Sequence, residues 1–171
     1  STTSGLDVVT NGTTEAAPFK TIKYACDFIQ ADVNNRTPAS VFIKTGAYEE
    51  ILPISVPKDT ALIGDELRST SVFPKVGYEA NDMFRVRNGG GIRNMSLNGL
   101  EGTLGAANSY GTRRPTGGAF VSLDPGTGPG DTSVHITSKS PYVQNVSTFG
   151  TGCTGLRVDG SLHNAGYRSV V

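Results

Sequence analysis

The segment Asp159-Gly160-Ser161-Leu162-His163 places an acid, a nucleophile and a base within five residues. These residue types serve nucleophilic catalysis, which needs the base within about 3.2 Å of the nucleophile and a third group to orient it. In an extended strand Ser161 and His163 would share a face, but residues two apart lie about 6.5–7 Å from each other. The Gly-Ser pair is also typical of a turn. We therefore predict no catalytic residue here or elsewhere in the chain.

Carboxylates are the second group of interest. Asp124 and Asp131 bracket a loop rich in Gly and Pro, and hard oxygen ligands suit calcium. Calcium takes six to eight oxygens, however, and Asp residues among Gly and Pro commonly form turns. Glu49 and Glu50 are adjacent, so a strand would point them to opposite faces. We predict neither a metal site nor a cofactor. Asp124 and Asp131 are the weak candidates for calcium ligands.

The two cysteines, Cys26 and Cys153, raise the choice between a disulfide and two separate thiols. Two cysteines cannot complete a structural zinc site, and no His or Cys lies at ligand spacing from either. A disulfide needs Cα atoms within about 7 Å. Because Cys26 falls on an expected helix and Cys153 falls late in the chain, we predict free thiols.

One aromatic and basic cluster, Tyr110, Arg113 and Arg114, lies in the stretch 103–118, which we expect to be a protruding loop. Long loops on a rigid scaffold often carry contacts, and Tyr and Arg are common interface anchors. The three residues are therefore candidates for contact with a partner or a carbohydrate. A solvated loop without a partner is the alternative.

The elements that must position these residues follow from a repeat. Ile92–Gly99 and Val143–Gly150 share one pattern, an Asn two residues after a β-branched residue, then small and apolar residues in alternation, then Gly. The short alternating strands Phe84–Val86 and Val134–Ile136 precede the two copies. A weaker third copy is Ile54–Val56, which leads to Ala61–Gly64. Such repeats predict stacked coils. Asn94 and Asn145 would then form a ladder of side-chain amides at equivalent turns.

Residues 18–35 have a different period, with apolar residues every three to four positions. This predicts one amphipathic helix that begins at Pro18 and stops at Asn34-Asn35. Its apolar stripe would cover the first coil, whose edge would otherwise face water. Residues 1–17 are rich in Thr, Ser and Gly and are expected to be a flexible lead-in.

Short strands are expected throughout the remainder of the chain, and antiparallel hairpins could also connect them. The aligned repeat favours parallel stacking, because hairpins would make neighbours mirror images. Grouped in threes, the strands form about four or five coils of a parallel β-helix over residues 18–171, interrupted at 103–118 and 124–132. The expected strands are Val41–Lys44, Ile51–Val56, Ala61–Ile63, Ser71–Phe73, Met83–Val86, Ile92–Leu97, Ala119–Leu123, Val134–Ile136, Val143–Ser147, Leu156–Val158 and Arg168–Val171.

Composition narrows the function classes. The 171 residues include 15 basic and 15 acidic ones, so no overall field attracts nucleic acid or an anionic membrane. No apolar run approaches the roughly 18–20 residues of a membrane span. Because Val171 falls within an expected strand, we expect the chain to be the N-terminal part of a longer protein.

Two families resemble this chain. Residues 18–74, with Val41-Phe42-Ile43-Lys44-Thr45-Gly46 and Leu62-Ile63-Gly64-Asp65, resemble the opening of pectin-lyase-like right-handed β-helix proteins, which include pectin methylesterases. The paired catalytic aspartates and oxyanion glutamines of those esterases have no matching motif here. The later stretch, Phe120–Leu123 with Ser140–Asn145 and Val158–His163, resembles virion structural proteins of T4-like cyanophages. This resemblance implies a tail or particle component.

Together these observations predict an all-β, right-handed parallel β-helix with an N-terminal capping helix, acting without catalysis as a structural or attachment component of a phage particle. Its partners would be other virion proteins or a surface polysaccharide, with a homo-oligomer possible and neither nucleic acid nor membrane bound. The alternative is a secreted carbohydrate-active enzyme, similar to polysaccharide lyases or esterases, or a carbohydrate-binding module on the same fold. An enzyme should show a groove with three or more convergent carboxylates or basic groups.

Overall fold

The computed structural model describes residues 5–32, 38–86, 89–107, 113–115, 117–123 and 141–158. Within these residues the protein is built mostly of strands, with one short helix, α1 (Ile22–Ala31). The strands are β1 (Ala39–Ile43), β2 (Gly46–Glu50), β3 (Ile54–Val56), β4 (Thr60–Gly64), β5 (Thr70–Pro74), β6 (Phe84–Val86), β7 (Gly91–Glu101), β8 (Leu104–Ala107), β9 (Arg113–Pro115), β10 (Ala119–Leu123), β11 (Tyr142–Thr151) and β12 (Thr154–Val158).

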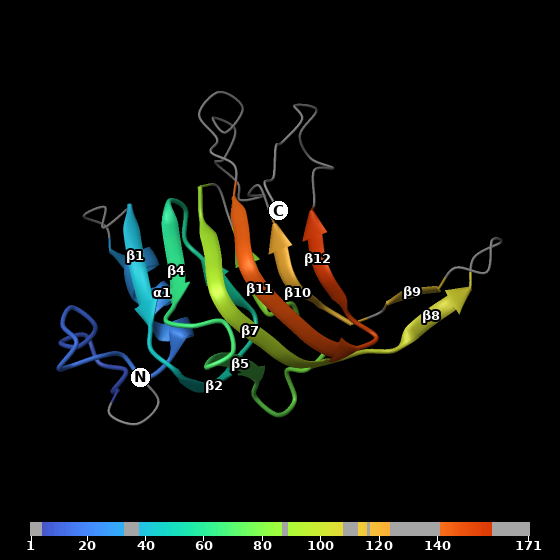
Figure 1. Cartoon of the computed structure of the whole chain (residues 1–171), viewed down its shortest axis with the longest axis horizontal. Coiled ribbons are helices and arrows are strands. Elements are labelled where there is room, and N and C mark those ends of the chain that lie inside the picture. Colours follow the sequence, from blue (N-terminus) through green and yellow to red (C-terminus); the bar gives the residue numbers. More distant parts are fainter. Residues whose placement is uncertain are drawn as a thin grey trace.

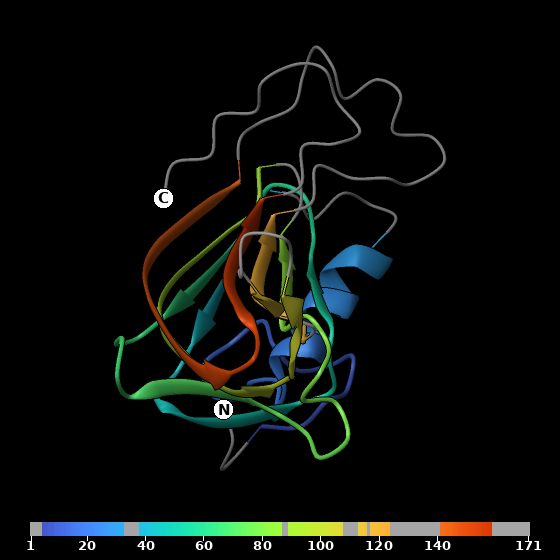
Figure 2. The same cartoon turned by 90° about the vertical axis from the view of Figure 1, so that its right-hand side faces the viewer.

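Two parallel sheets make up the body of the protein. The six-stranded sheet has the order β1-β4-β7-β5-β2, with β11 paired to β7, and the four-stranded sheet has the order β12-β10-β6-β3. The strands of both sheets pair in parallel with strands that lie far away in the sequence, as expected from the repeat. The sheets curl around a shared interior (Figures 1 and 2).

The interior is filled by rows of apolar side chains at matching positions of successive strands. Val41, Leu62, Ile92 and Val143 are register partners in β1, β4, β7 and β11. Leu62 and Ile92 are fully buried, and Val41 and Val143 pack against the same core. Because side chains alternate along a strand, one face of each strand supplies this core and the other faces outward.

Several predicted strands differ from the observed ones. The prediction missed β2, whose small residues Gly46 and Ala47 carry no strand pattern; its pairing with β5 makes it a strand. The predicted strand Ile51–Val56 was wrong at its start, because β3 begins at Ile54. The expected loop 103–118 contains β8 and β9, which form an antiparallel pair that projects from the body (Figure 1).

Two predicted strands, Val134–Ile136 and Arg168–Val171, lie outside the described residues. The repeat suggested that Val134–Ile136 would be the counterpart of Phe84–Val86. In the structure β10 has that place, since Val121 and Leu123 are the register partners of Phe84 and Val86.

The helix begins four residues later than predicted, at Ile22 and not at Pro18. Thr21 is the N-cap, and its Oγ1 accepts a hydrogen bond from the Tyr24 N–H at 3.2 Å. A hydroxyl in this place satisfies a backbone donor that the first helical turn leaves free. The helix ends at Ala31. It contacts β1, β2 and β3, the first strands of the two sheets, and so covers this end of the core as expected (Figure 1).

The segment expected to be a flexible lead-in, 1–17, is described from Gly5 onward and is bonded to the start of the helix. The Asp7 carboxylate accepts from the backbone N–H groups of Lys20 and Thr21 at 2.8 and 3.0 Å. It also accepts from the Thr21 hydroxyl at 2.8 Å. The Leu6 N–H donates to the Pro18 carbonyl oxygen, which leaves Pro18 in the segment before the helix.

Candidate functional site

Most of the chemistry-bearing residues singled out from the sequence lie outside the described residues. This holds for Tyr110, for Asp124 and Asp131, and for the segment Asp159–His163. Arg113 and Arg114 belong to β9, in the projecting antiparallel pair. The sites described below are built from Asn94, Asn145 and Glu50 and from residues that the sequence analysis did not single out.

The asparagine ladder joins two strands. The Asn145 Nδ2 donates to the Asn94 Oδ1 at 3.0 Å, the arrangement that the aligned repeat predicts. Both residues have positive φ, 58° for Asn94 and 50° for Asn145. Asn tolerates this left-handed conformation better than most residues. The conformation lets the two neighbouring strands turn at the same place. On the neighbouring strand β4, Gly64 follows the last residue that pairs with β7, and a Cβ there would lie 2.0 Å from the Asn94 carbonyl oxygen.

Glu49 and Glu50 point to opposite faces, as predicted. Glu49 is exposed, whereas Glu50, the last residue of β2, is buried. One Glu50 oxygen accepts from the Ile22 N–H at 2.6 Å and the other accepts from the Lys23 N–H at 3.1 Å. The carboxylate thus binds the free backbone donors at the positive end of α1.

Burial raises the pKa of Glu50 to about 7, although the hydrogen bonds from the Ile22 and Lys23 N–H groups act to lower it. The negative charge of Asp7 raises it slightly further. Desolvation disfavours the ionised carboxylate, and two backbone donors offset only part of that cost. Glu50 is therefore a carboxyl group that changes charge near neutral pH.

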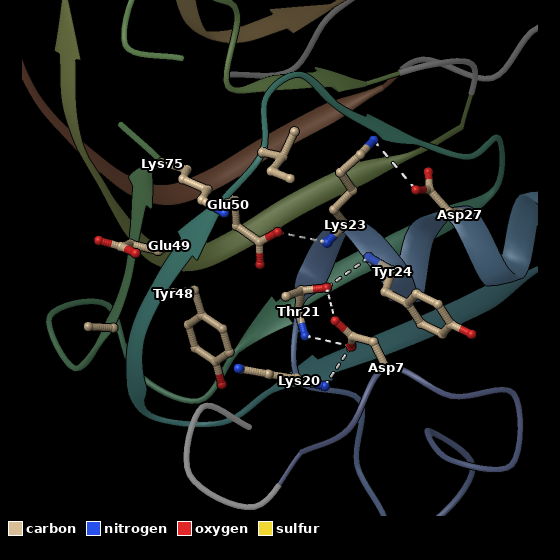
Figure 3. Close-up of a pocket in the computed structure, with 12 residues that line it drawn as sticks. Asp7, Lys20, Thr21, Lys23, Tyr24, Asp27, Tyr48, Glu49, Glu50 and Lys75 are labelled. Carbon is tan, nitrogen blue, oxygen red and sulfur yellow. Dashed lines mark hydrogen bonds and ion pairs between the residues drawn. The ribbon is translucent and has the colours of Figure 1, made fainter. Parts of the chain in front are cut away.

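A pocket of about 490 Å³ lies where α1 meets β2, and both Asp7 and Glu50 line it (Figure 3). Lys20, Lys23 and Lys75 also line it, so acidic and basic groups share the space. Most of them already have partners. Asp7 and Glu50 bind backbone donors, and the Lys23 Nζ pairs with Asp27 at 3.5 Å. The pocket therefore has the three or more convergent charged groups expected of an enzyme. However, its carboxylates Asp7 and Glu50 hold the start of α1 in place.

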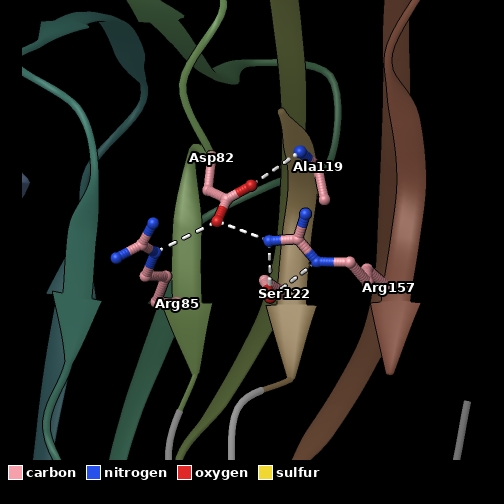
Figure 4. A network of polar contacts seen from close by, with 5 residues as sticks. All are labelled: Asp82, Arg85, Ala119, Ser122 and Arg157. Atoms are coloured by element: carbon pink, nitrogen blue, oxygen red, sulfur yellow. Dashed lines mark hydrogen bonds and ion pairs between the residues drawn. The ribbon is translucent and has the colours of Figure 1, made fainter. Parts of the chain in front are cut away.

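A second polar cluster lies on the outward face of the four-stranded sheet (Figure 4). Asp82 precedes β6 and is only 5% exposed. Its Oδ1 accepts from the Ala119 N–H at 2.9 Å, and its Oδ2 accepts from Arg85 Nε at 3.0 Å and from Arg157 Nη2 at 2.6 Å. Arg157 also donates to the Ser122 hydroxyl from Nε and Nη2, at 3.3 and 3.2 Å. One buried carboxylate thus ties together β6, β10 and β12.

The charges of this cluster do not cancel. Burial by itself would raise the pKa of Asp82, but the Ala119 N–H and the two guanidinium groups outweigh it and hold the pKa below its ordinary value. Asp82 is therefore ionised at neutral pH, next to two arginines whose side chains are 48% and 46% exposed. Two positive charges and one negative charge leave the cluster with one net positive charge.

Sequence reasoning missed this cluster. Asp82 and Arg157 are 75 residues apart, so their contact depends on how β6, β10 and β12 are stacked. One signal was present: Arg85 and Arg157 each stand between two apolar residues of a short strand, which predicts that both point outward. Nothing in the sequence showed that only β10 separates β6 from β12 in the sheet.

The prediction of free thiols is confirmed. Neither Cys26 nor Cys153 forms a disulfide. Cys26 lies on the buried face of α1 and is fully buried, and burial raises its pKa far above the ordinary value. Such a thiol is poorly reactive.

Two further properties concern only the part of the chain that the structure describes. There, no group of three or more His, Cys, Asp or Glu side chains could hold a metal ion. No helix there has the length and apolar character that crossing a membrane requires.

Comparisons of the chain with protein-family models, curated proteins and solved structures found no match.

Proposed function

We propose that this chain is a right-handed parallel β-helix that serves, without catalysis, as a structural or attachment component of a phage particle. The observation that carries the proposal is the parallel pairing of strands from distant parts of the sequence. β1, β4, β7 and β11 occupy successive places in one sheet, and β3, β6, β10 and β12 do so in the other. Such stacking gives a stiff, extended body with long outward faces.

The use of three carboxylates, two buried and one half-buried, also supports a non-catalytic role. Asp7, Glu50 and Asp82 each accept hydrogen bonds from backbone N–H groups, and Asp82 additionally holds two arginines. A catalytic carboxylate must be free to reach its substrate. These three stabilise the scaffold. The phage context is supported by the resemblance of Phe120–Leu123, Ser140–Asn145 and Val158–His163 to virion structural proteins of T4-like cyanophages.

Analysis of purified particles tests the proposal. Mass spectrometry of density-purified particles from a culture that encodes the chain should recover its peptides in stoichiometric amounts. The matched control is the particle-free supernatant of the same culture. Peptides confined to the supernatant would favour the secreted alternative and refute a virion role.

The alternative, a carbohydrate-active enzyme, is favoured by one observation. Glu50 has a pKa of about 7 and lines a pocket with Lys23 and Lys75, as a general acid would. Incubation with pectin, alginate and bacterial lipopolysaccharide, with and without calcium, should release neither unsaturated products nor reducing ends. Release that is lost in Glu50→Gln but kept in Glu49→Gln would establish the enzyme; release lost in Asp124→Asn or Asp131→Asn would place its site in that loop.

A further inference from the structure

One outward row of the four-stranded sheet is unusually polar. Ser55, Arg85, Ser122 and Arg157 are register partners in β3, β6, β10 and β12, and we call this row the arginine face. In β3 and β6 the residues on either side of the row are buried, so its side chains point away from the core. The arginine face therefore presents two guanidinium groups and the partly exposed Ser55 hydroxyl in one line across the sheet, whereas the Ser122 hydroxyl is buried and accepts hydrogen bonds from Arg157.

The two arginines keep hydrogen-bond donors unused. A guanidinium group has five N–H donors in a planar fork. Among the described residues, Arg85 donates only through Nε, and neither of its Nη atoms has a partner within those ranges. Arg157 uses Nε and Nη2, and its Nη1 has none within the same ranges. In Figure 4 only one Arg85 nitrogen is joined to Asp82, and no dashed line reaches the other two.

The buried Asp82 carboxylate holds both guanidinium groups in place, and its one negative charge neutralises only one of their two positive charges. It binds both guanidinium groups through one oxygen, which restricts the rotation of two long side chains before a ligand arrives. Pre-organised groups lose less conformational entropy on binding. An arginine fork matches the geometry of a carboxylate or phosphate oxygen pair. The net charge of the cluster therefore favours one anionic group.

We infer that the arginine face binds the carboxylate or phosphate groups of an acidic polysaccharide. The inference rests on the proposed attachment role, because it names the surface component that such a protein would hold. Ser55 lies beside Arg85 in the row and is partly exposed, so its hydroxyl can bond to a sugar hydroxyl next to the acidic group. Nucleic acid fits less well, because the chain has 15 basic and 15 acidic residues and therefore no overall positive field.

Binding of the whole chain to immobilised polysaccharides tests the inference. The probes are polygalacturonate for the carboxylate, phosphomannan for the phosphate and dextran as the neutral control, all at low salt. We expect binding to at least one acidic probe and none to dextran, and the stronger of the two acidic arms identifies the group. Absence of wild-type binding to both acidic probes would overturn the inference. Equally tight binding of single-stranded DNA would also overturn it, in favour of a general polyanion site.

Arg85→Gln is the informative variant, because it leaves the bonds among Asp82, Arg157 and Ser122 in place. It should weaken binding by about tenfold, the effect of losing one hydrogen-bonded charged group. Arg68→Gln is the matched control: Arg68 is exposed in the turn between β4 and β5, and its loss changes the net charge equally. Equal weakening in both variants, or none in Arg85→Gln, would refute a specific site. Thermal melting checks that both variants are folded.

A site-specific measurement does not depend on a variant. Titration with galacturonate oligomers or inorganic phosphate should shift the Nε–H NMR signals of Arg85 and Arg157 and leave that of Arg68 unchanged. Unchanged Arg85 and Arg157 signals would contradict the inference. Particle composition is measured separately, so a chain found in particles that binds no acidic polysaccharide would refute this inference and leave the proposed function standing.

Discussion

At the scale of single residues, the asparagine pair and Glu50 each combine a special backbone conformation or burial with a defined hydrogen bond. Asn94 and Asn145 hold a left-handed conformation and bond to each other across strands. Glu50 is a buried carboxyl group that binds the first turn of α1. In both cases the backbone conformation or the burial adds to the energetic effect of the hydrogen bond. Variants can separate the two contributions.

Replacing Asn94 separates the conformation from the hydrogen bond. Asn94→Gly removes the amide but accepts the positive φ of 58°, so it should cost about 0.5–1.5 kcal/mol. Asn94→Ala also removes the amide but keeps a Cβ in the left-handed region, which Ala tolerates less well than Asn, so it should cost about 1–2 kcal/mol more than Asn94→Gly. Urea unfolding of both variants measures the difference. Equal losses in the two variants would show that the ladder bond alone matters.

Glu50 should make the stability of the protein depend on pH. Its pKa rises from the ordinary value of 4.5 to about 7 in the folded protein, so folding favours the protonated form. The resulting stabilisation is present in full below about pH 4.5 and is lost as the pH rises through about 7. The contribution is at most roughly 3 kcal/mol. Glu50→Gln cannot titrate, so the difference in unfolding free energy between wild type and Glu50→Gln should change between pH 4.5 and 8, and a constant difference would contradict the argument.

At the scale of elements, α1 acts as the lid on one end of the core. Ile22, Ala25 and Cys26 are its buried residues, and it contacts the first strands of both sheets. Contacts at the N-terminal end of the helix fix its position. There, Thr21, Asp7 and Glu50 accept hydrogen bonds from backbone N–H groups of the first helical turn and of the residues just before the helix. A short helix of ten residues depends on such capping and packing, because isolated helices of this length are marginal in water.

Ile22→Asp tests this role. Ile22 is 2% exposed, and an aspartate there would bury a charge beside the Glu50 carboxylate. The expected cost is several kcal/mol, about 2 or more, seen as a lower melting temperature. Gln30→Glu adds the same charge at an exposed position of the helix and should change stability by less than about 0.5 kcal/mol. Equal melting temperatures for the two variants would show that the helix does not cover the core.

At the scale of the whole molecule, three distant segments meet backbone to backbone. Gly102 follows β7, Gly117 precedes β10 and Gly152 follows β11. The Gly102 N–H donates to the Thr151 carbonyl at 2.8 Å, and the Gly117 N–H donates to the Gly152 carbonyl at 3.2 Å. A Cβ on Gly102 would lie 2.4 Å from the Gly152 carbonyl oxygen and 2.5 Å from the Gly117 backbone. Only glycine permits this approach.

Gly102→Ala should therefore push the three segments apart and cost about 1–3 kcal/mol or more. The matched control is Gly155→Ala in β12, where a Cβ would meet only the Thr148 hydroxyl at 3.5 Å. In a strand, that change should be neutral or stabilise by up to about 1 kcal/mol. Denaturant unfolding compares the two. A Gly102→Ala protein as stable as Gly155→Ala would mean that the segments separate without cost.

The sequence by itself determined the features that depend on local alternation and on the repeat. Alternating apolar residues predicted most of the strands, the opposite directions of Glu49 and Glu50, and the meeting of Asn94 with Asn145. These properties follow from the period of two residues in a strand and from the stacking of identical patterns. The amphipathic period likewise predicted the helix, although it placed the start at Pro18, because the contacts that fix Ile22 as the first residue come from Asp7 and Glu50.

Only the tertiary structure decided the features that depend on stacking between distant strands. β2 is a strand because it pairs with β5, and the Glu50 carboxylate meets a helix 27 and 28 residues away. The Asp82 cluster requires β6, β10 and β12 to be neighbours, and the chain between them includes the projecting β8–β9 pair. Connections of unequal length carry no signal of register, so the sequence could not show which outward side chains share a row. Hydrogen bonding between the backbones sets that register, and with it the arginine face.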